Sequence, residues 1–453
     1  MKKALLFVVA LFASLMIMPN AFALEVASVD GVKYSTVQEA IDNANGKTVT
    51  LLSNVTESVT IPSGMTVTLD LGSYTLTNIE GKHTITNEGN LTITGSGTVD
   101  NVSHATAAVY NSTTGIATLN SGIYTRSSEK GSSAEESGNN SYYTIENHGN
   151  MTINDSVQVL NNGSFSSLLH NGFYNGTAEN PDGSLKPTLT INGGLFTGGL
   201  NTVKNDDDGI LTINGGTFTN VAQAAVLNWN STTITGGTFV SDKDVILNGK
   251  LDNIRDAGIL NITDGNFSAG EGYNIITKMG GSNADYDANI LVSGGTFNKT
   301  VEQMPIDENM EVVQNEDGTF TVQYKEADYS KVNELVAKAN SIDKTKYTAE
   351  SVKVLEALIN SIDYNKTVLE QDYVDGLAIS LQNAIDGLVE KTEESTNPED
   401  PDTDLPDFPE VNLPDKDVKD EVSNPKTVDN ISYAYIALLI SGLGVFVSLK
   451  RLA

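Results

Sequence analysis

Short segments in which hydrophobic and polar residues alternate recur from about residue 32 to residue 322. Residues 84–95 (TITNEGNLTITG), 144–153 (TIENHGNMTI) and 202–218 (TVKNDDDGILTINGGTF) share one order of features. Each has a short β-branched segment, an Asn, a turn and a second short segment, and the longest copy ends in Gly-x-Phe. Short strands repeated every 20 to 30 residues are typical of stacked coils of parallel strands. The pattern therefore predicts a mainly β protein built as a parallel β-helix.

Two recurrent positions predict how the coils are held together. Asn at a turn tolerates left-handed backbone, and its amide can hydrogen-bond to the Asn of the next coil, so one Asn in each coil predicts an internal ladder. The predicted ladder consists of Asn87, Asn111, Asn147, Asn171, Asn205, Asn228 and Asn248. The Gly-x-Phe element predicts one aromatic layer of the core. Its members are Phe196, Phe218, Phe239, Phe267 and Phe297.

Both ends of the repeat region have elements that would cover an open coil. Residues 35–46 predict an amphipathic helix that ends at Gly46, and residues 310–322 predict a closing hairpin. With its N-terminal helix, the region resembles the pectate-lyase-like right-handed β-helix family, which is found in adhesins and in polysaccharide-degrading enzymes. The resemblance implies that residues 24–326 form a right-handed parallel β-helix. A propeller or a sandwich is the alternative, although these folds need longer strands and hairpin turns.

The spacing of hydrophobic residues becomes helical from residue 327 to residue 390. Three helices are predicted around Val332, Leu335, Val336 and Ala339, around Val352, Leu355, Leu358 and Ile359, and around Leu377, Leu381, Ala384, Ile385 and Leu388. Residues 347–351 (YTAES), 373–375 (YVD) and 384–388 (AIDGL) resemble the FIVAR module of bacterial surface proteins. The resemblance implies a small three-helix bundle that serves as a wall-proximal stalk or binds sugars or matrix proteins. A spacer without a ligand is the alternative.

The first 23 residues have the parts of a secretory signal peptide. Lys2 and Lys3 precede an apolar run over residues 4–18, and residues 21–23 form an A-x-A cleavage site. A first transmembrane helix is the alternative, but the apolar run is shorter than the roughly 20 residues that a bilayer requires. We therefore expect an exported chain that begins at Leu24.

The C-terminal 63 residues predict a stalk and an anchor. Residues 391–423 hold 12 Asp or Glu against three Lys among several prolines, which predicts an extended, disordered wall spacer. Residues 424–453 then contain Asn424, Pro425, Lys426, Thr427 and Val428, 19 uncharged positions and a terminal Lys-Arg-Leu-Ala tail. The uncharged stretch is long enough for one transmembrane helix, and the basic pair would stay in the cytoplasm.

This C-terminal pattern resembles the sortase sorting signal of Gram-positive surface proteins, in its NPxT variant. The resemblance implies that sortase attacks the carbonyl of Thr427 and joins the chain to peptidoglycan. Val428 departs from the commonest form, which has Gly at that position, and this leaves the sortase class open. A permanent single-pass anchor is the alternative. In both cases we expect an extracellular protein on the cell wall that contacts the membrane only through the C-terminal helix.

The amino-acid composition excludes several classes of function. The chain has 453 residues, no Cys and a formal net charge of -31. The lack of Cys excludes a disulfide framework, a thiolate metal site and a cysteine enzyme. The acidic balance repels phosphate backbones, so no nucleic-acid partner is predicted.

The predicted β-helix has few groups of residues that could form a catalytic site. A lyase of this fold needs a base, commonly Arg or Lys, and cations that neutralise the sugar's carboxylate. The predicted β-helix has only two arginines, Arg126 and Arg255, which we expect to be solvated on loops. A glycosidase needs two nearby carboxylates, and residues 206–208 (Asp-Asp-Asp) form the only dense acidic run at a coil turn. We expect that turn to be solvated too. No enzyme activity is predicted, and a polysaccharide-degrading enzyme that uses Asp206, Asp207 and Asp208 is the alternative.

No metal or cofactor is predicted either. The four histidines, His83, His104, His148 and His170, do not have the spacing of metal ligands along the chain. Residues 285–289 begin like a calcium loop, but Ile290 stands where a Gly is expected and no Glu follows at the required spacing.

Long insertions near the Asn turn are the best candidates for binding. They cover residues 126–143, 172–187, 249–258 and 280–289. Aromatic rings near these turns could stack on sugars, namely Tyr142, Tyr143, Phe173, Tyr174 and Trp229. The sequence therefore predicts an adhesin-like surface protein whose ligand is a glycan or a host or matrix protein. The alternatives are the enzyme and a structural spacer without a ligand.

Overall fold

The computed structural model describes residues 24–133, 135–136, 141–249, 258–279, 289–301 and 304–392. They fall into two compact units, one that ends at Lys325 and one that begins at Glu326. The expected signal peptide, sorting signal and nearly all of the acidic spacer lie outside the described residues. Within the described ranges, no helix has the length and apolar character needed to cross a bilayer.

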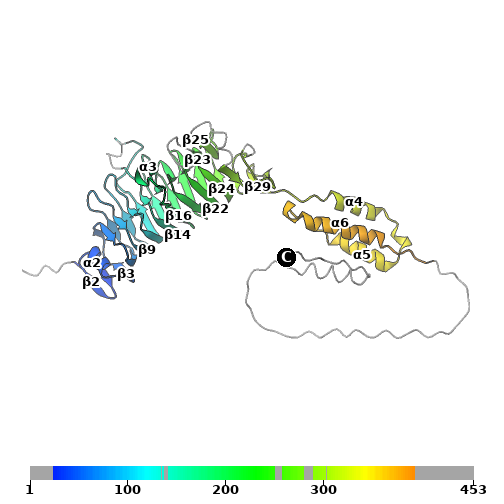
Figure 1. Cartoon of the computed structure of the whole chain (residues 1–453), viewed down its shortest axis with the longest axis horizontal. Helices are drawn as coiled ribbons and strands as arrows, with labels where there is room; N and C mark the ends of the chain where they lie inside the picture. The colour runs from blue at the N-terminus through cyan, green and yellow to red at the C-terminus, as the bar shows by residue number, and fades with distance from the viewer. Residues whose placement is uncertain are drawn as a thin grey trace, which may run out of the picture. The chain divides into compact units, whose positions relative to one another are not determined.

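Parallel strands stacked in chain order build the first unit (Figure 1). In the described part of the chain, nine of them form a sheet of their own, in which each strand hydrogen-bonds to the strand one coil away. These strands are β5 (Val59–Ile61), β8 (Ile85–Asn87), β11 (Val109–Asn111), β13 (Ile145–Asn147), β15 (Leu169–Asn171), β18 (Asn201–Asn205), β21 (Ala224–Asn228), β23 (Asp244–Gly249) and β25 (Ile276–Met279). We call this the nine-stranded sheet.

A larger sheet supplies the rest of each coil in two parts. One part contains β3 (Lys47–Leu51), β6 (Thr66–Asp70), β9 (Asn90–Thr94), β12 (Ile116–Thr125), β14 (Asn150–Leu160), β16 (Thr188–Ile191), β19 (Ile210–Ile213), β22 (Ser231–Ser241), β24 (Ile259–Ser268) and β26 (Ile290–Val292). The other part contains β4 (Val55–Thr56), β7 (Thr75–Thr77), β10 (Thr98–Asp100), β17 (Leu195–Thr197), β20 (Thr217–Asn220) and β27 (Thr296–Phe297). Long strands such as β12 run through both parts, because β12 pairs first with β9 and then with β10. The prediction of a mainly β fold of stacked parallel strands is confirmed.

The Asn ladder runs along the inner side of the nine-stranded sheet. Each Asn from 87 to 228 donates from its Nδ2 to the Oδ1 of the next Asn in the series, at 2.7 to 2.9 Å. All seven side chains are fully buried. Burial of a side-chain amide without hydrogen-bond partners is costly. The ladder therefore favours the strand register in which each Asn is hydrogen-bonded to the next. The ladder stops after Asn248, because Lys278 occupies the equivalent position of β25.

The predicted aromatic layer is a continuous stack. Neighbouring rings from Phe196 to Phe297 lie 4.7 to 5.0 Å apart between centroids and are nearly parallel. A Gly that stands two residues before each Phe makes this stack possible. Gly216, for example, has a φ of +105°, and a Cβ there would lie 3.2 Å from Cε2 of Phe196. Only Gly adopts this backbone easily and leaves room for the ring.

Both ends of the stacked coils are covered as expected. At the start, β1 (Ala27–Val29) and β2 (Val32–Tyr34) form an antiparallel pair, and α2 (Val37–Asp42) follows. The helix ends at Asp42, before the predicted stop at Gly46. The Oγ1 of Thr36 accepts from the N–H of Glu39 at 3.1 Å and caps this helix. At the other end, β28 (Met310–Gln314) and β29 (Phe320–Tyr324) form an antiparallel hairpin, and β29 also pairs with β27. These pairings cover the strand edges that would otherwise be open.

The described residues of the second unit form three helices and two short 3₁₀ turns, at Lys344–Lys346 and Val368–Glu370. The helices are α4 (Ser330–Ser341), α5 (Ala349–Asn360) and α6 (Gln371–Asp386). Their hydrophobic core is made by residues at helical spacing, including Val332, Leu335, Leu355, Val374, Leu377, Leu381 and Ile385.

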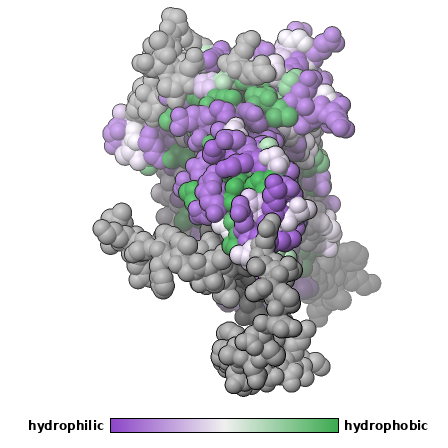
Figure 2. Space-filling view, turned by 90° about the vertical axis from the view of Figure 1, so that its right-hand side faces the viewer, coloured by the Kyte–Doolittle hydropathy of each residue, from purple (hydrophilic) through white to green (hydrophobic). Residues whose placement is uncertain are grey.

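The described surface that faces the viewer in Figure 2 is mainly hydrophilic, and hydrophobic residues form small patches on it.

Candidate functional site

The most unusual polar cluster lies on the outer side of the nine-stranded sheet. In β11, β13 and β15 the first and third residues point into the core, so the middle residue points outward. The parallel register places Tyr110, Glu146, His170 and Lys204 in one line across β11, β13, β15 and β18. We call these four residues the outer row. Three of them can carry charge, which is unusual for neighbouring side chains on one face of a sheet.

Two segments cover the outer row and take most of it out of solvent. Tyr143 stacks on His170 with centroids 4.2 Å apart, and Phe173 lies 5.0 Å from the ring of His148. Glu146 and His170 are buried, at 5% and 1% exposure. Phe173 begins the segment 172–187, which contains the short helix α3 (Gly176–Glu179). A sheet face that would otherwise be open to water is therefore a partly closed polar site.

The acidic run at residues 206–208 holds the covering segment in place. The carbonyl oxygen of Asp207 accepts from the N–H of Phe173 at 2.9 Å, and its Oδ2 accepts from the N–H of Gly176 at 3.0 Å. The carboxylate of Asp208 accepts from Asn180 and from Lys186, each at 2.8 Å. All three aspartates are buried. The expectation of a solvated turn is wrong, because segment 172–187 folds back over the turn and uses its carboxylates as acceptors.

Asp206 links the outer row to the aspartate turn. Its carboxylate pairs with the ammonium of Lys204 and lies 3.4 Å from Nε2 of His170. Burial disfavours the charged form of Asp206, but the hydrogen bond from His170 and the charge of Lys204 outweigh it and lower its pKa. Asp206 is thus held as a carboxylate.

Glu146, His148 and His170 converge on a small space under the covering aromatic rings. Oε1 of Glu146 lies 3.4 Å from Nε2 of His148 and 4.0 Å from Nδ1 of His170. Three buried polar atoms here have no hydrogen-bond partner: Oε2 of Glu146, Nε2 of His148 and Nδ1 of His170. A buried polar atom without a partner costs about 1 to 3 kcal/mol, so three around one point call for an explanation.

The ionisation of Glu146 depends on its histidine neighbours. Burial favours the neutral acid, but the 3.4 Å contact with His148 and the charges of His170, His148 and His83 outweigh it and lower the pKa of Glu146. The rings of His83 and Tyr110 stack at 4.7 Å beside the cluster, and burial lowers the pKa of His83. The cluster therefore has a carboxylate next to imidazoles.

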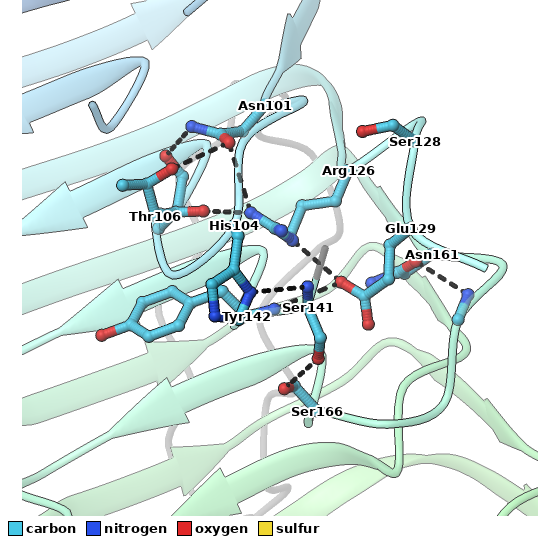
Figure 3. Close-up of polar contacts among 12 residues, drawn as sticks. Asn101, His104, Thr106, Arg126, Ser128, Glu129, Ser141, Tyr142, Asn161 and Ser166 are labelled. Carbon is cyan, nitrogen blue, oxygen red and sulfur yellow. Dashed lines mark hydrogen bonds and ion pairs between the residues drawn. The ribbon is translucent and has the colours of Figure 1, made fainter. Parts of the chain in front are cut away.

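Arg126, expected on the surface, is completely buried (Figure 3). Its Nε donates to Oε2 of Glu129 at 2.9 Å, and its other nitrogens donate to Asn101 and to the carbonyl oxygens of Ser103 and Thr106. Glu129 also accepts from the N–H of Tyr142 at 3.4 Å. The expectation of a solvated arginine is wrong, because loop residues fold over the guanidinium and supply acceptors for it. Arg255 lies outside the described residues.

The five aromatic residues proposed for sugar stacking differ in exposure. Tyr174 is 72% exposed, and the ammonium of Lys204 lies 4.8 Å from its ring centroid. Tyr142 and Tyr143 are half-buried. Phe173 and Trp229 are buried, at 2% and 6%, so neither presents a ring face to solvent. Trp229 instead packs in a hydrophobic cluster with Leu227 and Leu247, which continue the line of the outer row on β21 and β23.

Sequence spacing did not reveal the Glu146, His148 and His170 cluster. His148 and His170 are 22 residues apart, but each lies next to a ladder Asn, at positions 147 and 171. Numbering the residues relative to the ladder would have placed them on neighbouring strands, because Asn147 pairs with Asn171. Of the insertions predicted to project near the Asn turn, residues 250–257 and 280–288 lie outside the described residues, and so do Asp285 and Asp287.

Comparisons with known proteins add no relative. The chain matches no protein-family model, no curated protein and no solved structure. The functional argument therefore depends on the residues of the site.

Proposed function

We propose that this protein is a non-enzymatic extracellular surface protein whose β-helix binds a glycan or a host or matrix protein. The observation that carries the proposal is Tyr174, a large ring that is 72% exposed at the edge of the covered outer row. Lys204 lies against this ring, and half-buried Tyr142 and Tyr143 lie nearby over the same sheet. Aromatic rings with polar tips are suited to sugar rings, and Lys204 adds a cation for an acidic group.

The surface around Tyr174 is preorganised. The residues next to Tyr174 in the chain are held by hydrogen bonds to Asp207. The N–H of Tyr142 donates to Glu129, which is itself paired with buried Arg126. A rigid aromatic surface loses little conformational freedom when a ligand binds, and this favours affinity. We expect recognition to use this surface.

The remaining features belong to the same proposal. They are the right-handed hand of the β-helix and its likeness to the pectate-lyase-like family, the FIVAR-like character of the helical unit, export by the signal peptide and attachment by sortase. Stacked parallel strands with a covering helix at the start support the β-helix assignment, and three packed helices support the FIVAR-like assignment. Export by the signal peptide and attachment by sortase rest on sequence pattern alone.

The enzyme alternative is disfavoured by the state of the acidic turn. A general acid in a glycosidase needs a raised pKa, but the pKa of Asp206 is lowered by His170 and Lys204. The carboxylates of Asp207 and Asp208 accept hydrogen bonds that hold segment 172–187. These contacts favour a structural role for the three aspartates.

We expect Tyr174→Ala to weaken ligand binding about fivefold, because one stacking ring is worth about 1 kcal/mol. A glycan and matrix-protein array identifies the ligand with the wild-type protein, and titration then gives the dissociation constants. Tyr324→Ala is the matched control, since Tyr324 is an exposed ring at 42% on the closing hairpin. Reducing-sugar release is followed in the same wells. Equal loss in both variants would contradict the chosen surface, and product release abolished by Asp206→Asn would favour the enzyme.

We expect Thr427→Ala to move the protein from the peptidoglycan fraction to the membrane and the medium. Sortase requires the carbonyl of that Thr in a specific motif, and the substitution removes the motif. Cell-wall digestion followed by immunoblotting measures the distribution. Thr403→Ala in the acidic spacer is a control that should leave attachment unchanged. Covalent attachment of the Thr427→Ala chain would contradict the sortase proposal.

A further inference from the structure

We propose that Glu146, His148 and His170 form a binding site for one divalent transition-metal ion, with Zn²⁺ as the preferred ion. The proposal concerns residues that the ligand-binding surface does not use directly. It stands whether or not the protein binds a glycan.

The geometry of the three side chains fits a shared ion. One ligand atom from each residue can be chosen so that all of them lie within 4.8 Å of one another. Zn²⁺ binds imidazole nitrogen and carboxylate oxygen at about 2.0 to 2.2 Å in tetrahedral geometry, so two ligand atoms of one ion lie about 3.4 Å apart. Nε2 of His148 and Nδ1 of His170 lie 3.4 and 4.0 Å from Oε1 of Glu146, the other oxygen of the carboxylate that would bind the ion. Side-chain rotations that bring the most distant pair of ligand atoms about 1.4 Å closer would close the site around an ion.

The atoms that would bind the ion are buried and have no hydrogen-bond partner. They are Oε2 of Glu146, Nε2 of His148 and Nδ1 of His170. Glu146 and His170 are more than nine-tenths buried. A single cation in this space would satisfy all three at once. One buried water with three hydrogen bonds is the competing occupant, and the titration below distinguishes the two.

The other polar atom of each ligand has a partner that would orient it. Nε2 of His170 lies 3.4 Å from Oδ2 of Asp206, and Nδ1 of His148 lies 3.4 Å from the hydroxyl of Tyr110. Oε1 of Glu146 accepts from the hydroxyl of Tyr142 at 3.1 Å. Metal-binding histidines generally use the second ring nitrogen in this way, most often with a carboxylate or a carbonyl oxygen. Oδ2 of Asp206, placed next to Nε2, is suited to keep His170 in the tautomer that presents Nδ1 as a ligand.

The donor set selects the class of ion. Two imidazoles and one carboxylate suit Zn²⁺ and similar transition metals, whereas Ca²⁺ and Mg²⁺ prefer oxygen ligands. Two buried carboxylates, Glu146 and Asp206, face the single cation Lys204 in the cluster. One formal negative charge remains, and it offsets half of the charge of a divalent ion. Three protein ligands leave a fourth position for water or for a donor atom from a bound molecule.

The first test measures Zn²⁺ binding to the purified, chelator-treated protein by isothermal titration calorimetry. We expect one ion to bind each chain. His148→Gln should weaken this binding about 100-fold or more, because it removes a ligand, and Asp206→Asn should weaken it about 10 to 100-fold by releasing the orientation of His170. His104→Gln is the control, since His104 is exposed and outside the cluster, and it should leave the affinity unchanged. No binding by the wild-type protein, or equal binding by His148→Gln, would overturn the proposal.

A second measurement needs no variant and is therefore independent of their folding. Zinc K-edge X-ray absorption of the loaded wild-type protein should show two imidazole ligands, and Co²⁺ should give the strong visible absorption of a low-coordinate ion. A first shell of oxygen alone, or with one imidazole, would show that the ion sits elsewhere and would overturn the assignment. Zn²⁺ should also raise the unfolding temperature of wild type and His104→Gln but not of His148→Gln.

Discussion

Replacing Arg126 with Ala is expected to destabilise the first unit by about 3 to 5 kcal/mol. Arg126 and Glu129 are both fully buried and paired at 2.9 Å. Removal of the guanidinium leaves the carboxylate of Glu129 buried without its counter-charge. It also leaves the carbonyl oxygens of Ser103 and Thr106 without the donors that Arg126 provides. The cost of the lost partner, rather than the strength of the pair itself, produces the large effect.

Urea unfolding followed by far-UV circular dichroism measures this change. The double variant Arg126→Met/Glu129→Leu should recover a large part of the loss, because it removes both charges and keeps apolar volume. Lys33→Ala is the surface control, because Lys33 pairs with Glu25 at 2.6 Å while both side chains are more than half exposed. An unchanged unfolding midpoint for Arg126→Ala would show that the Arg126–Glu129 ion pair is accessible to solvent.

Replacing Phe218 with Ala is expected to destabilise the same unit by about 3 to 5 kcal/mol. The ring of Phe218 is completely buried and lies 4.7 Å from each of its neighbours in the stack, Phe196 and Phe239. Its loss leaves a cavity between two rings on neighbouring strands. The rings cannot close on it, because the hydrogen bonds of β17, β20 and β22 keep the strands at a fixed spacing.

Two further variants make the Phe218 experiment specific. Phe297 has only one ring neighbour in the stack, Phe267 at 5.0 Å, so Phe297→Ala should cost less than Phe218→Ala. Phe165 is 44% exposed, so Phe165→Ala should have the smallest effect. The same urea experiment compares the three. If Phe218→Ala were no more destabilising than Phe165→Ala, the aromatic layer would not be part of the stabilising core.

The repeated positions show what could be predicted from the sequence. The ladder Asn at or next to the end of a short strand and the Gly before Phe recur because every coil has to solve the same local problem, so their pattern survives in the order of residues. The left-handed backbone predicted for these Asn residues is wrong, because none of the seven has a positive φ. The Asn ladder, the aromatic layer, the capping helix and the closing hairpin are all present in the structure. The helical spacing after residue 327 likewise matches three packed helices.

The candidate site could not be predicted in the same way. Segments between ladder positions differ in length, so spacing along the chain says little about which side chains meet across coils. Glu146, His148 and His170 meet because β13 and β15 are neighbours, and their burial depends on segment 172–187 folding over them. Arg126 and the aspartates at 206–208 were expected in solvent for the same reason.

The sequence by itself determined the stacked coils, the positions of the ladder and the aromatic layer, and the elements at both ends, because these follow from local backbone preference and a repeated pattern of burial. The tertiary structure alone decided which charged side chains are buried and which imidazoles face a carboxylate. Burial of a charge depends on partners that arrive from another coil, and those partners are supplied by loops of irregular length. For this protein, that distinction separates the residues that build the rod from the Glu146, His148 and His170 cluster on its outer side.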